Sequence, residues 1–367
     1  MVTLQRGVAV AHPGNFLLFR ASFYRLIHGA SLYYPPPDQM TGFLYTPTFA
    51  LLFAPFAIWP VPVGLLLWNA ANALAVYYGV TRLLPPAAAR LALVLVFLDL
   101  LRTLQNSQSN ALVTGLLLVA FLALERRRAA TAAGTVLLGA CIKIFPLGAG
   151  VMGLLGPRRV RFALWSAAFG VVLAALPLLV LSPAAYAATL REWVTVLQRD
   201  SGLEGQSVMR ILSDWFGLAS PNWIVQLIGV LLLVTPAVAG EVWRDSAFRL
   251  RFLCSVLVFL VIFNHEAESA SFIVATTGIA IWFVTGPRTW WRTTLVALTL
   301  LGVSVPRLFF FPYQIYHDVI RAHALDAFPC VVVWVVMQVE LWRWPRPSRA
   351  EGTERDVAAG ETGRERR

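Results

Sequence analysis

This 367-residue chain has few charged residues, and their small number limits the classes of protein to which it can belong. Only 13% of the residues are charged, whereas 58% are hydrophobic. A soluble domain carries about twice that charged fraction. Apolar runs of about 15 to 23 residues recur along the whole length, and each is a candidate membrane span. The sequence therefore predicts an all-α, polytopic transmembrane helical bundle and excludes an ordinary soluble enzyme.

Several familiar site motifs are also missing. The three cysteines, Cys141, Cys254 and Cys330, lie far apart in apolar stretches, which favours core packing over a disulfide framework or a zinc site. There is no GxGxxG after a strand, no P-loop and no Asp-x-Asp. Residues 265–269 begin like the zinc motif HExxH, but Ser269 stands where the second histidine should be, so a metalloprotease is excluded.

The net charge of +11 does not indicate nucleic-acid binding, because the basic residues cluster at the ends of apolar segments. By the positive-inside rule, five such clusters mark the cytoplasmic side. They lie at 126–128, 158–161, 244–251, 288–292 and 343–349. The spans predicted between them in the second half are 161–181, 222–243, 250–263, 271–285, 289–305 and 324–343. This topology leaves 182–221, 264–270 and 306–323 outside the cell.

Two segments do not fit a simple crossing. Residues 129–157 lie between two cytoplasmic clusters and contain KIFP at 143–146, so we predict two short helices that meet at a break and return. In the first part of the chain, 43–58, 62–84, 88–104 and 110–125 are apolar. The segment 43–58 contains two prolines, and we expect that it is not a full crossing.

The remaining segments complete the predicted organisation. Residues 15–28 and 186–199 have amphipathic patterns that suit helices lying in the membrane interface, although plain surface helices would show the same pattern. We expect one transmembrane domain over 1–344 with external loops at 15–42, 182–221 and 264–270, and a disordered cytoplasmic tail over 345–367. Residues 1–14 hold no span or signal peptide, so we also expect that a preceding transmembrane helix is missing, through a misplaced start codon or a truncation.

Lys143 is the most unusual polar residue in the apolar phase. It is the only lysine among the 30 basic residues, and it lies in an apolar run beside a proline. An ionisable side chain at membrane depth is a functional-site hypothesis by default. An ammonium group there requires an anion, and a phosphate group would serve. The alternatives are a lysine that snorkels to the interface and a structural ion pair.

Two polar stretches accompany this lysine. The predicted external loop FNHEAESASF carries His265, Glu266 and Glu268, which could act as a general base or bind hydroxyl groups. The same charges would also occur in a solvent-exposed loop with no role in a site. The run QNSQSN at 105–110 is rich in amides, which bind sugar hydroxyls well, although Asn110 could instead cap a helix.

At this point the motifs resemble glycosyltransferase family 87. The matching stretches are YTPTFALLFAPFAIWP at 45–60, LWNAANAL at 67–74, QNSQSNALVTGLLL at 105–118, AAGTVLLGACIKIFPL at 132–147 and FNHEAESASFIVATTGIAIW at 263–282. Each motif is weak alone, but their order and spacing together are specific, and the resemblance covers most of residues 15–285.

The resemblance implies the GT-C membrane fold, with about 10–12 membrane segments including short broken helices. It further implies a hexosyltransferase that moves mannose, with inversion, from a polyprenyl-phosphate donor at the external face of the plasma membrane. The expected partners are that donor, a lipid or glycan acceptor and membrane lipids, with no nucleic acid. No metal and no cofactor are expected.

One departure from the family pattern concerns the base. Family members carry an acidic residue after the first span, whereas this chain has Asn15 at that position, in NFLLF. An amide cannot accept the proton of an acceptor hydroxyl. The base would then be Asp38, Glu266, Glu268 or His265, or the activity has changed.

We therefore predict a site with three groups of residues. Lys143 binds the donor phosphate, and His265, Glu268, Glu266 or Asp38 is catalytic. The sugar or the acceptor contacts five amide residues, namely Asn15, Gln105, Gln108, Asn110 and Asn264. The rival class is a transporter or lipid flippase, which also places charges in broken helices but usually shows internal repeats, and none is found in this sequence. A scaffold without chemistry would leave Lys143 unexplained.

Overall fold

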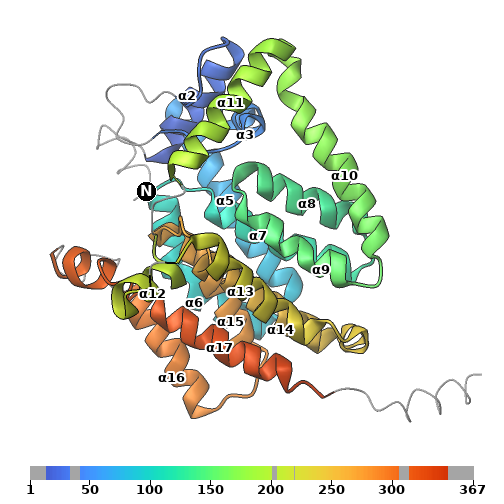
Figure 1. The fold of residues 1–367 in the computed structure, drawn as a ribbon, viewed down its shortest axis with the longest axis vertical. Helices are drawn as coiled ribbons and strands as arrows, with labels where there is room; N and C mark the ends of the chain where they lie inside the picture. The colour runs from blue at the N-terminus through green and yellow to red at the C-terminus, as the bar shows by residue number, and fades with distance from the viewer. Residues whose placement is uncertain (1–13, 34–41, 201–204, 219, 306–313, 346–367) are drawn as a thin grey trace, which may run out of the picture.

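The computed structural model describes residues 14–33, 42–200, 205–218, 220–305 and 314–345. Within these ranges every regular element is a helix, which confirms the predicted all-α class (Figure 1). The first part contains α2 (Asn15–Ile27), α3 (Pro47–Leu52), α4 (Ala54–Ala57), α5 (Val61–Leu83), α6 (Pro86–Gln105), α7 (Asn110–Glu125), α8 (Ala129–Ile142), the 3-10 helix η1 (Phe145–Ala149) and α9 (Gly150–Leu155).

The second part contains the remaining helices of the bundle. They are α10 (Arg159–Ala175), η2 (Leu176–Leu179), α11 (Pro183–Asp200), α12 (Val208–Phe216), α13 (Asn222–Val234), η3 (Thr235–Ala237), η4 (Gly240–Arg244), α14 (Ser246–Ile262), η5 (Ser269–Ser271), α15 (Phe272–Val284), α16 (Trp290–Thr299), the π-helical turns η6 (Leu300–Ser304) and η8 (Ile315–Arg321), and α17 (Phe328–Trp342).

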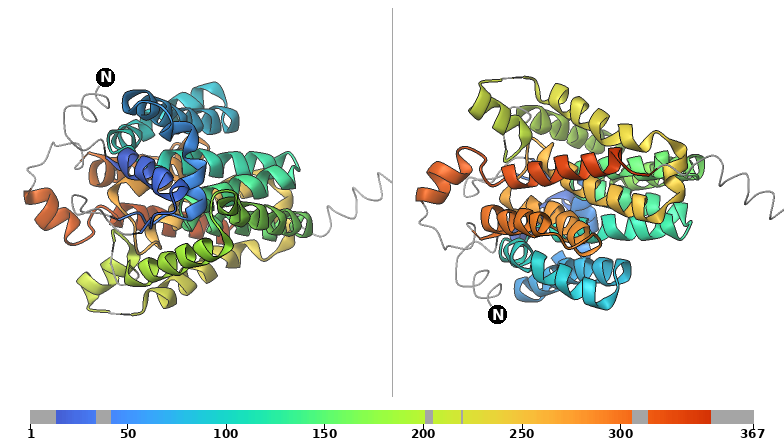
Figure 2. Two further views of the ribbon diagram at one scale, coloured as in Figure 1. Left: turned by 90° about the horizontal axis from the view of Figure 1, so that it is seen from above. Right: turned by 90° about the horizontal axis from the view of Figure 1, so that it is seen from below.

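The central helix of the bundle is α15. Its sequence is apolar around the whole circumference, and every side chain from Phe272 to Phe283 is buried. A helix without a polar face must be covered on all sides, and α6, α7, α14, α16 and α17 pack around it. The two views in Figure 2 place α5 and α6 on one side of the bundle and α11 to α13 on the opposite side.

The described helices support a membrane location without fixing the number of crossings. By length and composition, two of them could cross a membrane, namely α5 and the continuous helix Arg159–Leu179 formed by α10 and η2. That second helix runs along the right-hand edge of Figure 1 and exposes apolar side chains such as Leu164 and Val171. Other apolar helices, including α7 and α17, have only 10–17 residues. The count of about 10–12 membrane segments therefore remains a prediction.

The basic clusters gather at one end of the bundle. The guanidinium of Arg158 donates to the backbone oxygen of Arg127 at 2.8 Å, so the two ends of segment 129–157 are neighbours. Arg249 forms a bidentate ion pair with Glu125, with N···O distances of 2.5 and 2.7 Å. These contacts bring three clusters together, as the positive-inside rule requires.

The same end also holds the later clusters. Glu340 of α17 lies 3.4 Å from Arg251 and 3.7 Å from the buried Arg292. The indole nitrogen of Trp344 donates to Asp245 at 3.0 Å. The clusters are thus on one side of the bundle, and the assignment of that side to the cytoplasm remains a prediction.

The break predicted in segment 129–157 lies at Lys143. α8 ends at Ile142, and Lys143 adopts an extended conformation with φ −140° and ψ 143°. Pro146 then packs against Gly139, where an added Cβ would meet the proline ring at 3.3 Å. η1 and α9 return along α8, which agrees with the predicted pair of short helices. Residues 43–58 likewise fold as the two short helices α3 and α4 and not as one long span.

The predicted interface helix at 15–28 forms as α2, but its apolar face is buried in protein. Phe19 contacts the rings of Phe49, Phe53 and Trp68, with centroid distances of 5.1, 5.4 and 5.8 Å. The polar Ser22 of the same helix is buried as well. An amphipathic pattern shows only that one face of the helix is shielded from water. Here the aromatic side chains of α3, α4 and α5 cover it, so the interfacial prediction is corrected.

Candidate functional site

A large cavity lies at the end of the bundle opposite the basic clusters. Its volume is about 1830 Å³, compared with roughly 300–1,000 Å³ for a typical small-molecule pocket. α14 connects the two ends: it begins beside Asp245 and ends at Ile262, directly before the cavity-lining residue Phe263. The space is large enough for two substrates side by side.

Most of the predicted site residues line this cavity although they are far apart in sequence. They come from the start of α2, the turn between α6 and α7, the break after α8 and the loop between α14 and η5. The predicted residues in the lining are Asn15, Gln108, Lys143, Asn264, His265, Glu266 and Glu268.

Three other predicted residues are placed differently. Gln105 is the last residue of α6 and is half-buried outside the cavity lining. Asn110 is the first residue of α7 and is fully buried, with no hydrogen bond from either amide atom among the described residues. It neither lines the cavity nor caps the helix. Asp38 lies outside the described residues.

Lys143 forms one wall of the cavity. Its extended backbone ends α8, and its half-buried side chain belongs to the cavity lining. Its ammonium nitrogen lies 5.9 Å from the centroid of the Tyr45 ring, at the limit of a cation–π contact. No carboxylate of the described residues pairs with it within 4 Å. Among those residues, the structural ion-pair alternative therefore has no candidate.

The loop at 264–270 forms a second wall and is held by its neighbours. The backbone nitrogens of Gly205 and Gln206 donate to the oxygens of His265 and Ala267, at 2.5 and 2.8 Å. Gly205 has no room for a side chain, because an added Cβ would lie 2.6 Å from the nitrogen of Ala267. Asn264 accepts the backbone N–H of Glu266 at 3.2 Å. These contacts fix the loop that carries the three ionisable residues.

Glu268 is exposed to the cavity and is oriented by an amide. Gln108 Nε2 donates to its carboxylate at 3.3 Å. Burial raises the pKa of the Tyr45 phenol well above its usual range, and the negative charge of nearby Glu268 raises it further. Tyr45 therefore stays neutral and lies close to both the ammonium of Lys143 and the carboxylate of Glu268. The cavity thus presents a cation and an anion around one aromatic ring.

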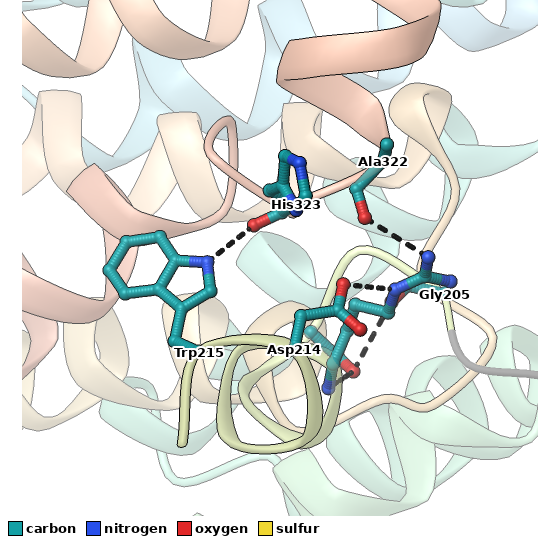
Figure 3. A network of polar contacts seen from close by, with 7 residues as sticks. Gly205, Asp214, Trp215, Ala322 and His323 are labelled. Carbon is teal, nitrogen blue, oxygen red and sulfur yellow. Dashed lines mark hydrogen bonds and ion pairs between the residues drawn. The ribbon is translucent and has the colours of Figure 1, made fainter. Parts of the chain in front are cut away.

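A third wall comes from α12 and the segment after η8. Arg210 binds Asp214 at 2.7 Å and the backbone oxygen of Ala322 at 3.0 Å. The indole of Trp215 donates to the backbone oxygen of His323 at 2.9 Å (Figure 3). These bonds fasten α12 to the chain beside η8. Nothing in the amino-acid sequence indicates that these two distant segments meet.

Sequence reasoning missed several residues of the lining. In the sequence, Tyr45 stands out only as part of a family motif, and the arginines of the lining belong to none of the five basic clusters. Gln226 could have been identified from the sequence, because it is a polar residue within the apolar helix NWIVQLIGVLLLV. The missed polar or aromatic residues of the lining include Tyr45, Arg102, Gln206, Arg210, Gln226 and Arg321.

Comparison with protein families identifies the family of this chain. The family model described as Glycosyltransferase family 87 matches residues 43–263. A search of curated proteins gave no match. The matched region contains Lys143, Gln108 and the helices from α3 to α14, whereas α2 and the whole loop 264–270 lie outside it. Because the match spans more than half of the chain, the chain belongs to this family.

Proposed function

We propose that this member of glycosyltransferase family 87 moves a hexose, in the simplest case mannose, from a polyprenyl-phosphate donor to a lipid or glycan acceptor. Family membership supports a membrane glycosyltransferase. The observation that carries the finer proposal is the cavity itself. Lys143, with no described carboxylate as partner, forms one wall, and the acid-bearing loop 264–270 forms another.

The proposed reaction needs both the Lys143 wall and the wall formed by the loop 264–270. The acceptor hydroxyl attacks the anomeric carbon, a new carbon–oxygen bond forms, and the bond from that carbon to the phosphate oxygen breaks. Polyprenyl phosphate leaves with one more negative charge than it had as a diester. A cation held beside that oxygen stabilises the transition state more than the ground state, which is the requirement for catalysis.

Lys143 suits the donor phosphate in this scheme. It lies at a helix break, where the backbone no longer forces its side chain along the helix surface. The proton released by the acceptor passes to a carboxylate of the opposite loop, and we assign this role to Glu268 because it is exposed to the cavity and oriented by Gln108. Asn15, Gln108 and Asn264 are placed to contact sugar or acceptor hydroxyls.

The proposed location is the external face of the plasma membrane. The cavity lies opposite the basic clusters, and the positive-inside rule assigns those clusters to the cytoplasm. The multi-pass arrangement and the cytoplasmic C-terminal tail are part of the same proposal. A flippase would also need charged groups at this depth, but family membership favours transferase chemistry.

The proposed function is tested by transfer from a defined donor. The purified chain in lipid nanodiscs would receive polyprenyl-phosphate-[¹⁴C]mannose together with a membrane-lipid extract as the acceptor source. We expect radioactivity to move to a second, more polar lipid or glycan, with the opposite anomeric configuration to that of the donor. A nucleotide sugar supplied alone should give no product. Transfer directly from the nucleotide sugar, or none from polyprenyl-phosphate mannose or glucose, would contradict the proposal.

Restoring an acid at position 15 is expected to bring no gain in transfer. Asn15 Nδ2 donates to the backbone oxygen of Asn106 at 3.1 Å, and an ionised aspartate could not donate there. Asn15→Asp should therefore lose about 1 kcal/mol of stability in a denaturant or thermal unfolding measurement. Asn15→Ala is the matched control, since it removes the same bond without adding charge. A rise in transfer of about tenfold or more in Asn15→Asp would place the base at this position.

A further inference from the structure

We propose that Gln226 fixes the proton of His265 on Nε2, so that His265 is a positioning residue and the proton acceptor in this loop is a carboxylate. The catalytic meaning of this inference rests on the proposed transferase function. The position of the proton can be measured without any substrate.

The orientation of the Gln226 amide is set by a backbone carbonyl. Its Nε2 atom lies 3.1 Å from the oxygen of Phe263. A carbonyl oxygen can only accept a hydrogen bond, so Gln226 must present its NH₂ group to that oxygen. The same nitrogen lies 3.3 Å from Nδ1 of His265. Both hydrogens of the amide are thus directed at neighbouring acceptors.

The amide leaves one tautomer for a neutral His265. A neutral imidazole has one nitrogen that donates and one that accepts. Because an N–H of Gln226 points at Nδ1, this atom must accept, and the proton lies on Nε2. Nε2 is 3.6 Å from Oε1 of Glu266, which is longer than a direct hydrogen bond. The Nε2–H group therefore faces the side chain of Glu266.

A base needs a lone pair that can accept a proton. In this arrangement the lone pair of Nδ1 is engaged by Gln226, and Nε2 already carries a hydrogen. Adding a proton to Nδ1 would set two N–H groups against each other or force the amide to abandon Phe263. The acceptor of the substrate proton is then Glu268 or Glu266, and His265 acts through its neighbour.

The surroundings of His265 do not reverse this assignment. The bonds from Gly205 and Gln206 go to the backbone oxygens of His265 and Ala267 and do not involve the ring nitrogens of His265. The charged groups that share the cavity influence how readily the ring gains a second proton, whereas Gln226 decides where the first proton lies. These groups are Glu266 and Glu268 of the same loop, Lys143 after α8, Arg102 of α6, Arg210 of α12, and Asp318 and Arg321 of η8.

The tautomer is measured by ¹⁵N NMR of the full-length protein, labelled at histidine and held in detergent micelles. The chain has 5 histidines, and His265→Gln identifies the signals of His265 by their loss. In the wild type we expect the Nε2–H tautomer. Gln226→Leu should give a mixture of both tautomers. Gln226→Glu, whose carboxylate accepts from Nδ1–H, should keep His265 doubly protonated to higher pH.

A neighbouring residue provides the control. Leu227 follows Gln226 on the same helix and is 50% exposed, so Leu227→Ala should leave the His265 signals unchanged. An Nδ1–H tautomer in the wild type would overturn the proposal. Identical His265 signals in wild type, Gln226→Leu and Gln226→Glu would overturn it as well.

Transfer rates then separate a positioning role from catalysis. We expect Gln226→Leu and His265→Gln each to lower kcat about tenfold, with KM little changed and an altered pH profile. If His265→Gln were as damaging as Glu268→Gln, His265 would be the base and the proposal would fail. A wild-type protein with no transfer at all would contradict the proposed function, while the NMR result would still decide the tautomer.

Discussion

Replacement of Lys143 by methionine is expected to abolish measurable sugar transfer while the protein still inserts and purifies. The substitution keeps the length of the side chain but removes the cation that we propose faces the departing phosphate. Loss of one preorganised group of this kind costs about 10²–10³-fold in kcat. No described carboxylate pairs with Lys143. Lys143→Met therefore breaks no ion pair among the described residues, and the free energy of unfolding should change little.

The control for Lys143→Met is Leu147→Met. It introduces the same residue in the same broken segment, at a side chain that is 50% exposed and lies outside the cavity lining. Transfer by that variant should remain close to wild type. Lys143→Arg retains the charge and should keep part of the activity. Wild-type turnover in Lys143→Met would show that the donor phosphate is bound elsewhere.

Glu268→Gln is expected to lower kcat by about 10²-fold or more, because proton transfer by a positioned base contributes that much. The glutamine retains an oxygen that can accept from Gln108, so the local geometry is preserved and only the charge is lost. Transfer at increasing pH should recover little in the variant, since no base remains to titrate at this position.

Glu241→Gln is the matched control, since it makes the same chemical change in the exposed turn η4 at the other end of α14. The informative comparison is with Asp38→Asn. If Asp38→Asn abolishes transfer and Glu268→Gln does not, the base lies in the first predicted external loop and the assignment to Glu268 is wrong.

Much of the fold could be predicted from the sequence because its signals are local. Apolar runs without a polar face predicted buried or membrane helices, and α15 is the clearest case. Proline in KIFP predicted the break that exposes Lys143. Arginines at the ends of apolar segments predicted which helix ends lie on the same side of the bundle. The ion pair of Arg249 with Glu125 agrees with this prediction.

The rest depends on contacts between distant segments. The amphipathic pattern of α2 showed that one face of the helix is shielded from water. It could not show that Phe19 on that face packs against Trp68 and not against lipid. The amide run at 105–110 indicates a polar site, but not which of its members face the cavity. That depends on where α6 ends and α7 begins, which places Asn106 and Gln108 in the lining and buries Asn110. Gln226 could be noticed in its helix, but its partner His265 lies 39 residues away.

A cryo-EM structure in lipid nanodiscs with a short-chain polyprenyl-phosphate hexose would show directly whether Lys143 and the loop 264–270 form two walls of one transferase site. We expect density for the phosphate within about 4 Å of the Lys143 ammonium, with the anomeric carbon of the sugar facing Glu268. Phosphate density bound away from Lys143, or a sugar directed away from the loop 264–270, would contradict this arrangement.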